Sequence, residues 1–419
     1  MVSKYKETEI GSMPEEWDVT SLSDAFQNLE AGVSVNSDER QNADFFVLKT
    51  SAISDGLINI DEAKPVVKKE YARLKCPVKK GSIIISRMNT PQLVGACGYV
   101  AEDAKSYFLP DRLWQVVNSK PEKYDFRWLN YLLNQYKYKN AIHAVATGTS
   151  NSMKNISKER LLEIRIPRPS IEEQKFIVEA ISDIETLIYD LEKLIKKKRN
   201  IFTGTMQSLL SGKIRISDSL WEKYVIGDIG DFYSGLTGKS KDDFGKGNAR
   251  YITFLNVLNN TVIDISKLEP VQVNEDEYQN EVLKGDLFFN TSSETPEEVG
   301  MCAVLMDSIR NTYLNSFCFG FRLKTKKVHA LFFSYYFNSQ EGRKIMRVLA
   351  QGATRFNLSK DYFSQTEIEL PPYEDQVEIA QTLADMEGDI LSLEKKCLKY
   401  KAMKQGMMEE LLTGKVRLV

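Results

Sequence analysis

The sequence predicts an α+β protein in which two pseudo-symmetric globular units are separated by two long helices that pair with each other. The first observation is an internal repeat, in which residues 157–216 match residues 359–418 without a gap at 21 of 60 positions. The second is that apolar residues recur at spacings of four and three in both copies. The third is a mixture of strand-like and helix-like patterns upstream of each copy.

Length and composition limit the class of protein. A chain of 419 residues with 42% hydrophobic and 27% charged residues is typical of a folded protein of two or three domains. Its 56 Lys and Arg against 58 Asp and Glu exclude binding of acidic polymers through bulk charge, so any basic surface must be local. Five cysteines without a CxxC pair, a polar N-terminus and the lack of a long apolar run predict a cytoplasmic protein without a membrane contact.

Each region upstream of the repeated block carries the same order of expected elements. A glycine turn followed by an apolar run predicts a buried strand at Val78–Ser86 and at Val282–Asn290. Aromatic-rich segments predict helices at Asp125–Tyr138 and Val328–Ser339, so each region should be a compact α+β unit. A weaker match at a shift of 204 supports this, and it pairs Trp17, Leu22, Asp24, Gly81 and Gly148 with Trp221, Ile226, Asp228, Gly285 and Gly352.

The repeated block predicts one long helix in each half. The first begins with Ser170-Ile171-Glu172-Glu173, which has the form of a capping box, and the second begins after Pro371-Pro372. Gly212 and Gly414, each followed by Lys, are typical of helix C-caps. Each apolar stripe is narrow and flanked by charge, so we expect the helices to pair within the chain. The stripes consist of Ile177, Ile181, Ile184, Ile188, Leu191 and Ile195, and of Ile379, Leu383, Met386, Ile390, Leu393, Cys397 and Tyr400.

This organisation predicts four segments with boundaries at residues 1–169, 170–212, 213–370 and 371–419. The C-terminal Val416-Arg417-Leu418 matches the segment that leads into the second unit, which makes the repeat cyclic. We therefore expect the two termini to lie close together and the molecule to have a pseudo-twofold axis.

Four motifs that could carry catalysis do not meet the chemical requirements. Leu370-Pro371-Pro372-Tyr373 is similar to an amino-methyltransferase loop, but Leu cannot accept the hydrogen bond of an amine, so a helix-start turn is expected. Gly238-Lys239-Ser240 would end a phosphate loop, but Tyr233 stands where that loop needs glycine. The two histidines, His143 and His329, lie in separate units, and cysteine catalysis would need one of them nearby. The sequence therefore predicts no catalytic residue and no metal site.

Short polar segments in each unit are candidates for nucleic-acid recognition. They combine Gly, Lys or Arg with Ser, Thr and Asn, which bind phosphates and base edges. The candidates are Arg87, Asn89, Thr90, Thr147, Thr149, Ser150, Asn151, Lys154 and Asn155 in the first unit, and Thr237, Lys239, Ser240, Lys241, Asn290, Thr291, Ser292, Ser293, Thr354, Arg355 and Asn357 in the second. The alternative is that these are ordinary polar turns, but their matched placement after equivalent strands and helices favours a shared binding edge.

Clusters of basic residues also occur in the predicted helices. They are the run Lys196–Arg199 in the first helix, and Lys395, Lys396, Lys399 and Lys401 in the second. Such runs usually form a solvated helix face, and contact with phosphate or with a partner is the alternative.

A set of short motifs is duplicated in the same order, with divergent units between the copies. The motifs are Trp17 after Ile10-Gly11 and Pro14-Glu15-Glu16, the strand Lys80-Gly81-Ser82-Ile83-Ile84, Glu173-Gln174 after the prolines, and two L-L-[ST]-G-K helix ends. This pattern resembles the specificity (S) subunit of type I restriction-modification systems over the whole chain. The resemblance implies that each unit is a target recognition domain for one half of a split DNA sequence. It also implies that the helices pair antiparallel as a spacer and a docking surface.

The resemblance also implies partners and cofactors. The partners are duplex DNA, two methyltransferase (modification) subunits and the restriction subunits that translocate and cleave DNA. S-adenosylmethionine, ATP and Mg would belong to those subunits, and this chain would itself be non-catalytic and carry no cofactor.

The repeated helix from Ile379 to Leu411 would span about 48 Å at about 1.5 Å per residue, or roughly one and a half turns of B-DNA.

Two functions from other classes remain open at this point. A protein–protein interaction scaffold would fit the paired helices and the near-neutral net charge, and salt-sensitive binding to duplex DNA would distinguish recognition from it. A DNA methyltransferase would need a donor-binding glycine loop and an intact amino-group loop, and the sequence has neither.

Overall fold

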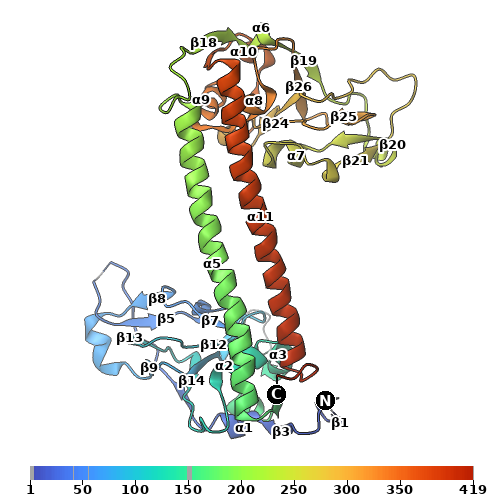
Figure 1. The fold of residues 1–419 in the computed structure, drawn as a ribbon. Coiled ribbons are helices and arrows are strands. Elements are labelled where there is room, and N and C mark those ends of the chain that lie inside the picture. The colour runs from blue at the N-terminus through green and yellow to red at the C-terminus, as the bar shows by residue number, and fades with distance from the viewer. Residues whose placement is uncertain (1–3, 41, 55, 149–152, 419) are drawn as a thin grey trace. The chain divides into compact units, whose positions relative to one another are not determined.

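The computed structural model describes residues 4–40, 42–54, 56–148 and 153–418, and the chain folds into two compact units (Figure 1). The first unit is Met1–Leu191 together with Lys396–Val419, and the second is Glu192–Lys395. Two long continuous helices belong to both units, α5 (Ile171–Leu210) and α11 (Tyr373–Leu411). One end of each helix lies in the first unit and the other end in the second. The predicted long helices are therefore confirmed.

The first unit contains two four-stranded sheets and several small ones. One four-stranded sheet is antiparallel and has the order β12 (Cys97–Tyr99), β10 (Ile83–Ser86), β14 (Leu113–Val116), β4 (Leu29–Ala31). The other is mixed and has the order β8 (Ala63–Pro65), β5 (Phe46–Leu48), β13 (Ala104–Phe108), β9 (Pro77–Val78). The small sheets are β11 (Met88–Asn89), β16 (Lys154–Ile156) and β15 (Ala146–Thr147); β17 (Arg165–Arg168) and β3 (Asp18–Ser21); β1 (Tyr5–Thr8) and β2 (Gly11–Pro14); and β6 (Ile53–Ser54) and β7 (Leu57–Ile58).

The second unit repeats this plan with different residues. Its antiparallel sheet has the order β19 (Gly230–Ser234), β26 (Cys318–Leu323), β22 (Leu287–Asn290), β24 (Cys302–Val304). Its mixed sheet has the order β21 (Glu269–Val271), β20 (Phe244–Ile252), β25 (Thr312–Leu314). The small sheets are β23 (Ser292–Ser293), β28 (Phe356–Leu358) and β27 (Ala350–Gln351), and β18 (Glu222–Val225) with β29 (Glu367–Leu370). Each mixed sheet contains one parallel pair, β5 with β13 and β20 with β25.

The remaining α-helices of the described residues also occur in matching order, except that the second unit has an additional one, α7. In the first unit they are α1 (Leu22–Ala25), α2 (Phe126–Leu133), α3 (Tyr136–Ala144) and α4 (Lys158–Leu162). In the second they are α6 (Ile226–Ile229), α7 (Phe254–Asn259), α8 (Ala330–Asn338), α9 (Gln340–Leu349) and α10 (Lys360–Ser364). The helix predicted to run to Tyr138 instead ends at Leu133, because the Asn134 side chain bonds back to the Asn130 carbonyl at 2.9 Å and a new helix starts at Tyr136.

Buried strands form the centre of each unit, as the apolar runs predicted. Ile83, Ile84 and Ile85 of β10 are fully buried, and so are Leu287, Phe288 and Phe289 of β22. Strand side chains point alternately to opposite faces, so a strand that is apolar throughout needs cover on both faces. In the first unit the two faces belong to two separate clusters, one with Ile83 and Ile85 and one with Ile84.

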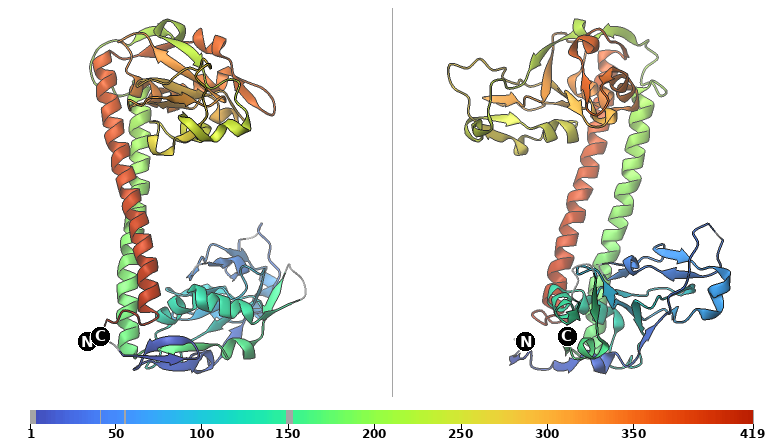
Figure 2. Two further views of the ribbon diagram at one scale, coloured as in Figure 1. Left: turned by 90° about the vertical axis from the view of Figure 1, so that its right-hand side faces the viewer. Right: turned by 180° about the vertical axis from the view of Figure 1, so that it is seen from behind.

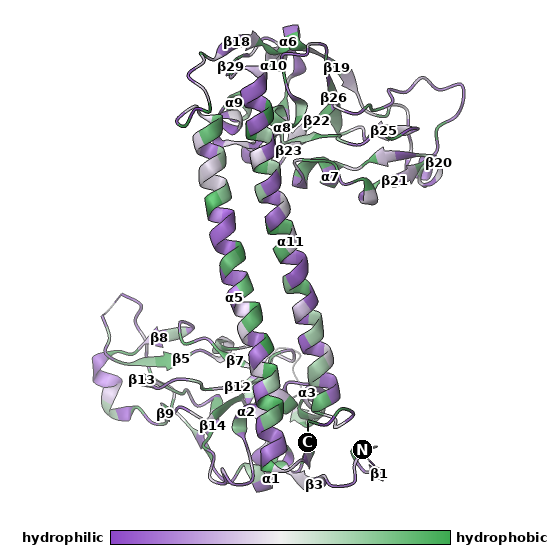
Figure 3. Ribbon diagram, in the orientation of Figure 1, coloured by the Kyte–Doolittle hydropathy of each residue, from purple (hydrophilic) through white to green (hydrophobic). Residues whose placement is uncertain are grey.

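The two long helices lie side by side within each unit (Figure 1) and pair antiparallel. Polar and apolar residues mix along both of them (Figure 3). In the predicted apolar stripes, the buried residues are Ile177, Ile181, Ile184, Ile188, Ile379, Leu383, Ile390 and Cys397, and the half-buried ones are Leu191, Ile195, Met386, Leu393 and Tyr400. In the first unit Lys404 pairs with Glu185 at 2.7 Å, and in the second Lys198 pairs with Asp389 at 3.0 Å. From the first pair to the second, the residue number rises along α5 (Glu185 to Lys198) and falls along α11 (Lys404 to Asp389). The two helices are therefore antiparallel.

Equivalent contacts attach each globular part to its end of the helix pair. The side-chain amide of Gln174 bonds to the backbone N of Asp125 and the backbone O of Lys123 at 2.8 and 2.9 Å. Gln376 makes the corresponding bonds to His329 and Lys327 at 2.9 and 3.1 Å. A buried amide that satisfies backbone groups of another element holds the two elements in fixed orientation.

In each unit a tyrosine of the globular part also bonds to a long helix. Tyr131 donates to the Glu185 carboxylate at 2.7 Å, and Tyr335 donates to Glu387 at the same distance. Burial, and then the hydrogen bond to Glu185, raises the pKa of Tyr131 to about 12.

The first and last described segments of the chain lie close together in the first unit, as the cyclic repeat predicted (Figure 2). Tyr5 donates to the Gly414 carbonyl at 2.9 Å, and Arg417 forms ion pairs with Glu16 and Glu173.

The expected capping box at Ser170 forms only in part. The Ser170 hydroxyl accepts from the Glu173 amide at 3.2 Å, but the Glu173 carboxylate binds Arg417 and the Trp17 indole N–H instead.

The two predicted C-cap glycines end the long helices. Gly212 has a φ of +70° and Gly414 a φ of +74°, in the left-handed region that glycine adopts without strain.

The five cysteines are buried and unpaired, and burial raises the pKa of the Cys97 and Cys318 thiols to about 12. In the described part of the chain, no helix has the length and apolar character needed to cross a membrane.

Candidate nucleic-acid interface

A three-stranded ribbon in each unit brings most of the predicted recognition segments together. We call β11-β16-β15 the first ribbon and β23-β28-β27 the second ribbon. Asn155 lies in the central strand opposite Met88 and Thr147, and Asn357 lies in the central strand opposite Ser292 and Gln351. The two ribbons are therefore the same structure at equivalent places in the chain.

The loop between the last two strands of each ribbon explains why the sequence matches at two shifts. It covers residues 148–153 in the first ribbon and 352–355 in the second, so the first is longer by two residues. Gly148 and Gly352 both open the loop with a φ of +146°, and a Cβ at Gly352 would lie 2.0 Å from the Arg355 carbonyl oxygen. The candidates Thr149, Ser150 and Asn151 fall in this loop, outside the described residues.

Arg87 and Asn155 carry unpaired buried polar atoms on the first ribbon. The Arg87 guanidinium lies 5.4 Å from the centre of the Trp114 ring, and its Nε is buried without a partner among the described residues. The Oδ1 atom of Asn155 is likewise buried and unpaired. Because buried polar atoms normally have partners, these two side chains have unused hydrogen-bonding capacity.

The other described candidates of the first ribbon have local partners. Lys154 donates to the Gly148 carbonyl at 2.7 Å, and Thr147 donates to the Asn155 carbonyl at 3.3 Å. Asn89 is buried, donates to Ser86 Oγ at 3.1 Å and accepts from the Thr90 amide at 2.9 Å. Asn89 therefore supports the ribbon from inside, whereas Thr90, Thr147 and Lys154 reach its surface.

Arg355 on the second ribbon is exposed and held from one side. Its Nε and Nη2 atoms donate to Ser292 Oγ at 3.2 and 3.0 Å. Asn357 donates to the Arg355 carbonyl at 3.4 Å and so closes the loop, and Thr354 beside it is exposed. Arg355 thus presents a guanidinium whose orientation is fixed before any ligand binds.

The start of the second ribbon is mostly structural in this conformation. Asn290 is fully buried, and its amide bonds to the carbonyls of Ser292 and Glu298 at 3.3 and 2.8 Å. Thr291 donates to the Phe317 carbonyl at 2.7 Å, and Ser293 donates to Glu298 at 2.8 Å.

The segment Thr237–Lys241 does not join the second ribbon within the described residues. The Thr237 amide donates to Gln279 Oε1 at 3.1 Å, Lys239 pairs with Glu277, and Ser240 forms a capping box with Asp243. These candidates therefore form a separate cluster near the mixed sheet, whose basic members are Lys239 and Lys241.

Sequence reasoning missed a lysine that occupies the same place in both units. Lys158 lies 5.9 Å from the centre of the Trp114 ring, and Lys360 lies 5.4 Å from the Phe319 ring. The two rings are equivalent, because Trp114 pairs with Ile85 and Phe319 pairs with Phe289 in matching strands. The identity of Lys158 and Lys360 within the repeat was the signal that could have shown it.

The basic run of the first long helix is partly neutralised. Lys198 pairs with Asp389, and Arg199 bonds to the Glu394 carboxylate at 2.9 and 2.5 Å. Lys196 and Lys197 are exposed. Lys198 and Arg199 therefore stabilise the helix pair. Lys196 and Lys197 are consistent with the expected solvated face.

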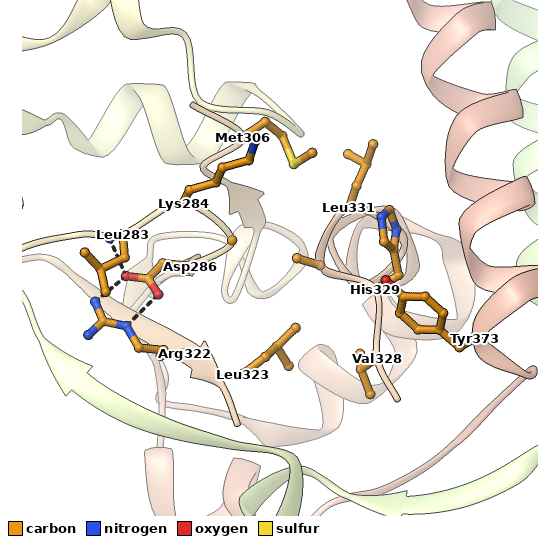
Figure 4. A pocket seen from close by; sticks show the side chains of 12 residues that line it. Leu283, Lys284, Asp286, Met306, Arg322, Leu323, Val328, His329, Leu331 and Tyr373 are labelled. Atoms are coloured by element: carbon orange, nitrogen blue, oxygen red, sulfur yellow. Dashed lines mark hydrogen bonds and ion pairs between the residues drawn. The ribbon is translucent and has the colours of Figure 1, made fainter. Parts of the chain in front are cut away.

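A pocket of about 450 Å³ in the second unit contains His329 but no catalytic pairing among the described residues (Figure 4). Asp286 lies away from His329 in the pocket and binds Arg322 at 2.7 and 2.8 Å, and it also accepts from Tyr233 and the Leu283 amide. The His329 Nδ1 atom is buried without a partner, and burial lowers the pKa of the imidazole.

Comparison with known proteins gives consistent results. The model of the type I restriction modification DNA specificity domain matches residues 14–200 and 218–399. The MjaX specificity subunit, assigned to a type I restriction enzyme of Methanocaldococcus jannaschii, is 24% identical over 428 residues, which cover 99% of this chain and 96% of the relative.

Two solved structures show the same fold. The S subunit of a type I restriction-modification system from M. genitalium has a TM-score of 0.57 and 16% identity, and the match covers 98% of this chain and 99% of that one. The HsdS subunit from Thermoanaerobacter tengcongensis has a TM-score of 0.50 and 16% identity, and the match covers 96% of this chain and 98% of that one.

Proposed function

Because the chain belongs to the type I restriction-modification DNA specificity family, we propose that it recognises a bipartite DNA sequence, with one half bound by each unit. The observation that carries this proposal is the repeated ribbon. Both units place the same three strands at equivalent points of the chain, yet the side chains differ, as at Arg87 directly before β11 and its counterpart Thr291 directly before β23. A shared scaffold with different polar side chains suits two different short ligands.

The proposal extends to the partners of the chain. Two copies of a DNA adenine methyltransferase subunit would dock on it, and the restriction subunits would join that complex in the cytoplasm. S-adenosylmethionine, ATP and Mg would be bound by those partners, and this chain would act without catalysis of its own.

Selection from a random duplex library tests the proposal. The full chain, mixed with its modification subunit, is expected to enrich two short motifs at a fixed separation. The affinity should fall steeply as salt rises, since phosphate contacts release counterions. Enrichment of no motif, with affinity that ignores salt, would instead support an interaction scaffold.

Calorimetric titration with S-adenosylmethionine tests the division of roles. The chain alone is expected to show no binding, and addition of the modification subunit should produce it. Micromolar binding of the methyl donor by the chain alone would contradict a purely recognising role.

A further inference from the structure

A tight turn beside each ribbon presents two exposed residues on a fixed backbone, Asp111 and Arg112 in the first unit and Ser316 and Phe317 in the second. In the first unit the turn precedes β14 and carries Arg112, and in the second it precedes β26 and carries Phe317. Phe317 is 57% exposed although it is a large apolar residue, and Arg112 is exposed as well. Neither residue stood out in the sequence, because the two turns align only at a shift of 205.

The same hydrogen bonds connect both turns to their ribbons. The Arg112 carbonyl accepts from the Arg87 amide at 3.1 Å, and the Phe317 carbonyl accepts from the Thr291 amide at 3.0 Å. The next bond also repeats, since Ile156 donates to the Arg87 carbonyl and Leu358 to the Thr291 carbonyl, both at 2.9 Å. Position 112 or 317 is therefore joined through two backbone bonds to the central strand of the ribbon.

Each turn is closed in the same way. Leu113 donates to the Pro110 carbonyl and Cys318 donates to the Asn315 carbonyl, both at 3.4 Å. In the second unit the buried Asn315 adds a further constraint, because its Oδ1 accepts from the Phe317 amide at 2.9 Å. The backbone is thus fixed on both sides of the exposed ring.

The scaffold itself does not require either side chain. A packing role would demand similar residues at equivalent places, but one unit has a cation here and the other an aromatic ring. An isolated exposed apolar residue is ordinary on a protein surface. Here the exposed residue is Phe317, whose carbonyl accepts a hydrogen bond from Thr291, directly before β23 of the second ribbon. Phe and Arg are residue types that contact thymine methyl groups and guanine edges.

We propose that positions 112 and 317 are specificity-determining residues, one for each half of the DNA target. The inference rests on the proposed function and names further contacts for it. Arg112 would bind a guanine edge in the first half-site, and Phe317 would make an apolar contact with a thymine methyl group in the second. The turn would hold each side chain at the same distance from its ribbon.

The test compares duplex libraries selected by the full chain with its modification subunit. Phe317→Ala is expected to reduce discrimination about tenfold at a thymine of the second half-site, and to leave the first half-site unchanged. Arg112→Ala should have the same effect at a guanine of the first half-site only. Leu220→Ala is the control, since Leu220 is 80% exposed but lies in the segment between α5 and β18.

The outcomes separate this inference from the proposed function. If the unmodified chain enriches a bipartite motif and both variants enrich the same motif with equal stringency, the inference is wrong and the proposed function stands. A uniform loss of affinity across all sequences would also overturn it, because that is the effect of a phosphate contact. If the unmodified chain enriches nothing, both fail. Circular dichroism melts of each variant check that the fold is retained.

Discussion

Arg355 presents the second ribbon's guanidinium in an orientation that Ser292 fixes. Bidentate recognition of guanine by arginine contributes about 1–3 kcal/mol of discrimination. We expect Arg355→Ala to remove about this much, and to relax preference within the second half-site only. Binding to a panel of single-base variants of the target measures it.

The matched control for Arg355 is the asparagine that repeats between the ribbons. Asn357 closes the loop through its bond to the Arg355 carbonyl, and Asn155 occupies the same strand position in the first unit. Replacement of either asparagine by alanine should weaken binding to all sequences of the panel similarly. A uniform loss for Arg355→Ala as well would rule out base recognition by Arg355.

Asp24 provides a test of stability with a defined dependence on pH. Its carboxylate accepts from Lys120 at 2.6 Å and from Tyr124 at 2.7 Å, and these two bonds hold its pKa below the ordinary value of 3.8. A lowered pKa in the folded state adds stability above the ordinary pKa, and this stability is lost as the pH falls through the folded value. We expect Asp24→Asn to lower the free energy of unfolding by about 1–2 kcal/mol at pH 7, and the difference to shrink below about pH 4.

Urea unfolding followed by tryptophan fluorescence measures this effect. Three of the four tryptophans, Trp17, Trp114 and Trp128, lie in the first unit and report on it. The control is Asp228→Asn, because Asp228 is the exposed counterpart of Asp24 in the second unit. An equal effect of both substitutions at pH 7 would mean that the hydrogen bonds of Asp24 do not stabilise the fold.

Residue types and local order predicted part of the candidate interface. The segments around Arg87, Asn155 and Arg355 were found because polar residues followed matching strands, and the structure joins them in the ribbons. Lys158 and Phe317 were missed because their neighbours are distant in the sequence. Their significance depends on an aromatic ring and a backbone bond that only the fold supplies.

At the scale of elements, the antiparallel helix pair is held by ion pairs on both sides of Tyr400. Lys404 pairs with Glu185 in the first unit, and Glu394 pairs with Arg199 in the second. Seven residues inserted near Tyr400 in α11 alone should break the register of one set of pairs and cause a large loss of helix-pair stability. Insertion of one heptad in both helices, the second after Leu191, should retain both sets.

The matched insertion also makes a prediction about the DNA target. Each heptad adds about 10 Å of helix, or roughly three base pairs of spacer. Library selection with the matched variant should return the same two half-sites at a wider separation. An unchanged separation would show that the helices do not set the spacing.

Periodicity predicted the long helices well because their apolar stripes extend over several heptads. It failed where a side chain had a distant partner. Glu173 has the sequence position of a capping-box residue, but its carboxylate binds Trp17 and Arg417, so the box stays half formed. The end of α2 at Leu133 was missed for a local reason, because the Asn134 side-chain amide bonds back to the carbonyl of Asn130 in the preceding turn.

At the scale of the whole molecule, we expect residues 19–166 of the first unit to be exchangeable between relatives. Cuts at Val19 and Ile166 fall in one two-stranded sheet, in which Val19 pairs with Pro167 and Ile166 with Thr20. The Gln174 attachment contacts backbone atoms, so it tolerates a domain of different sequence. We expect a chimera with residues 19–166 of a relative to recognise a new first half-site, and to keep the second half-site and the spacing. Loss of both half-sites together would contradict two independent recognition units.

The repeat made the two-unit organisation predictable from one sequence, and the antiparallel sheet and the three-stranded ribbon have the same strand order in both units. The proposed limits of the recognition domains, residues 1–169 and 213–370, stay a prediction. The bases of the target could not be predicted, because base recognition depends on how the ribbons approach the DNA groove.

A methylation map of genomic DNA tests the central claim most directly. The chain would be expressed with its modification subunit in a host that lacks this system, and modified adenines would be located by sequencing. The account predicts methylation at two short motifs separated by a fixed number of unspecified bases, and none when the chain is omitted. Methylation at one contiguous motif, or methylation that does not depend on the chain, would contradict it.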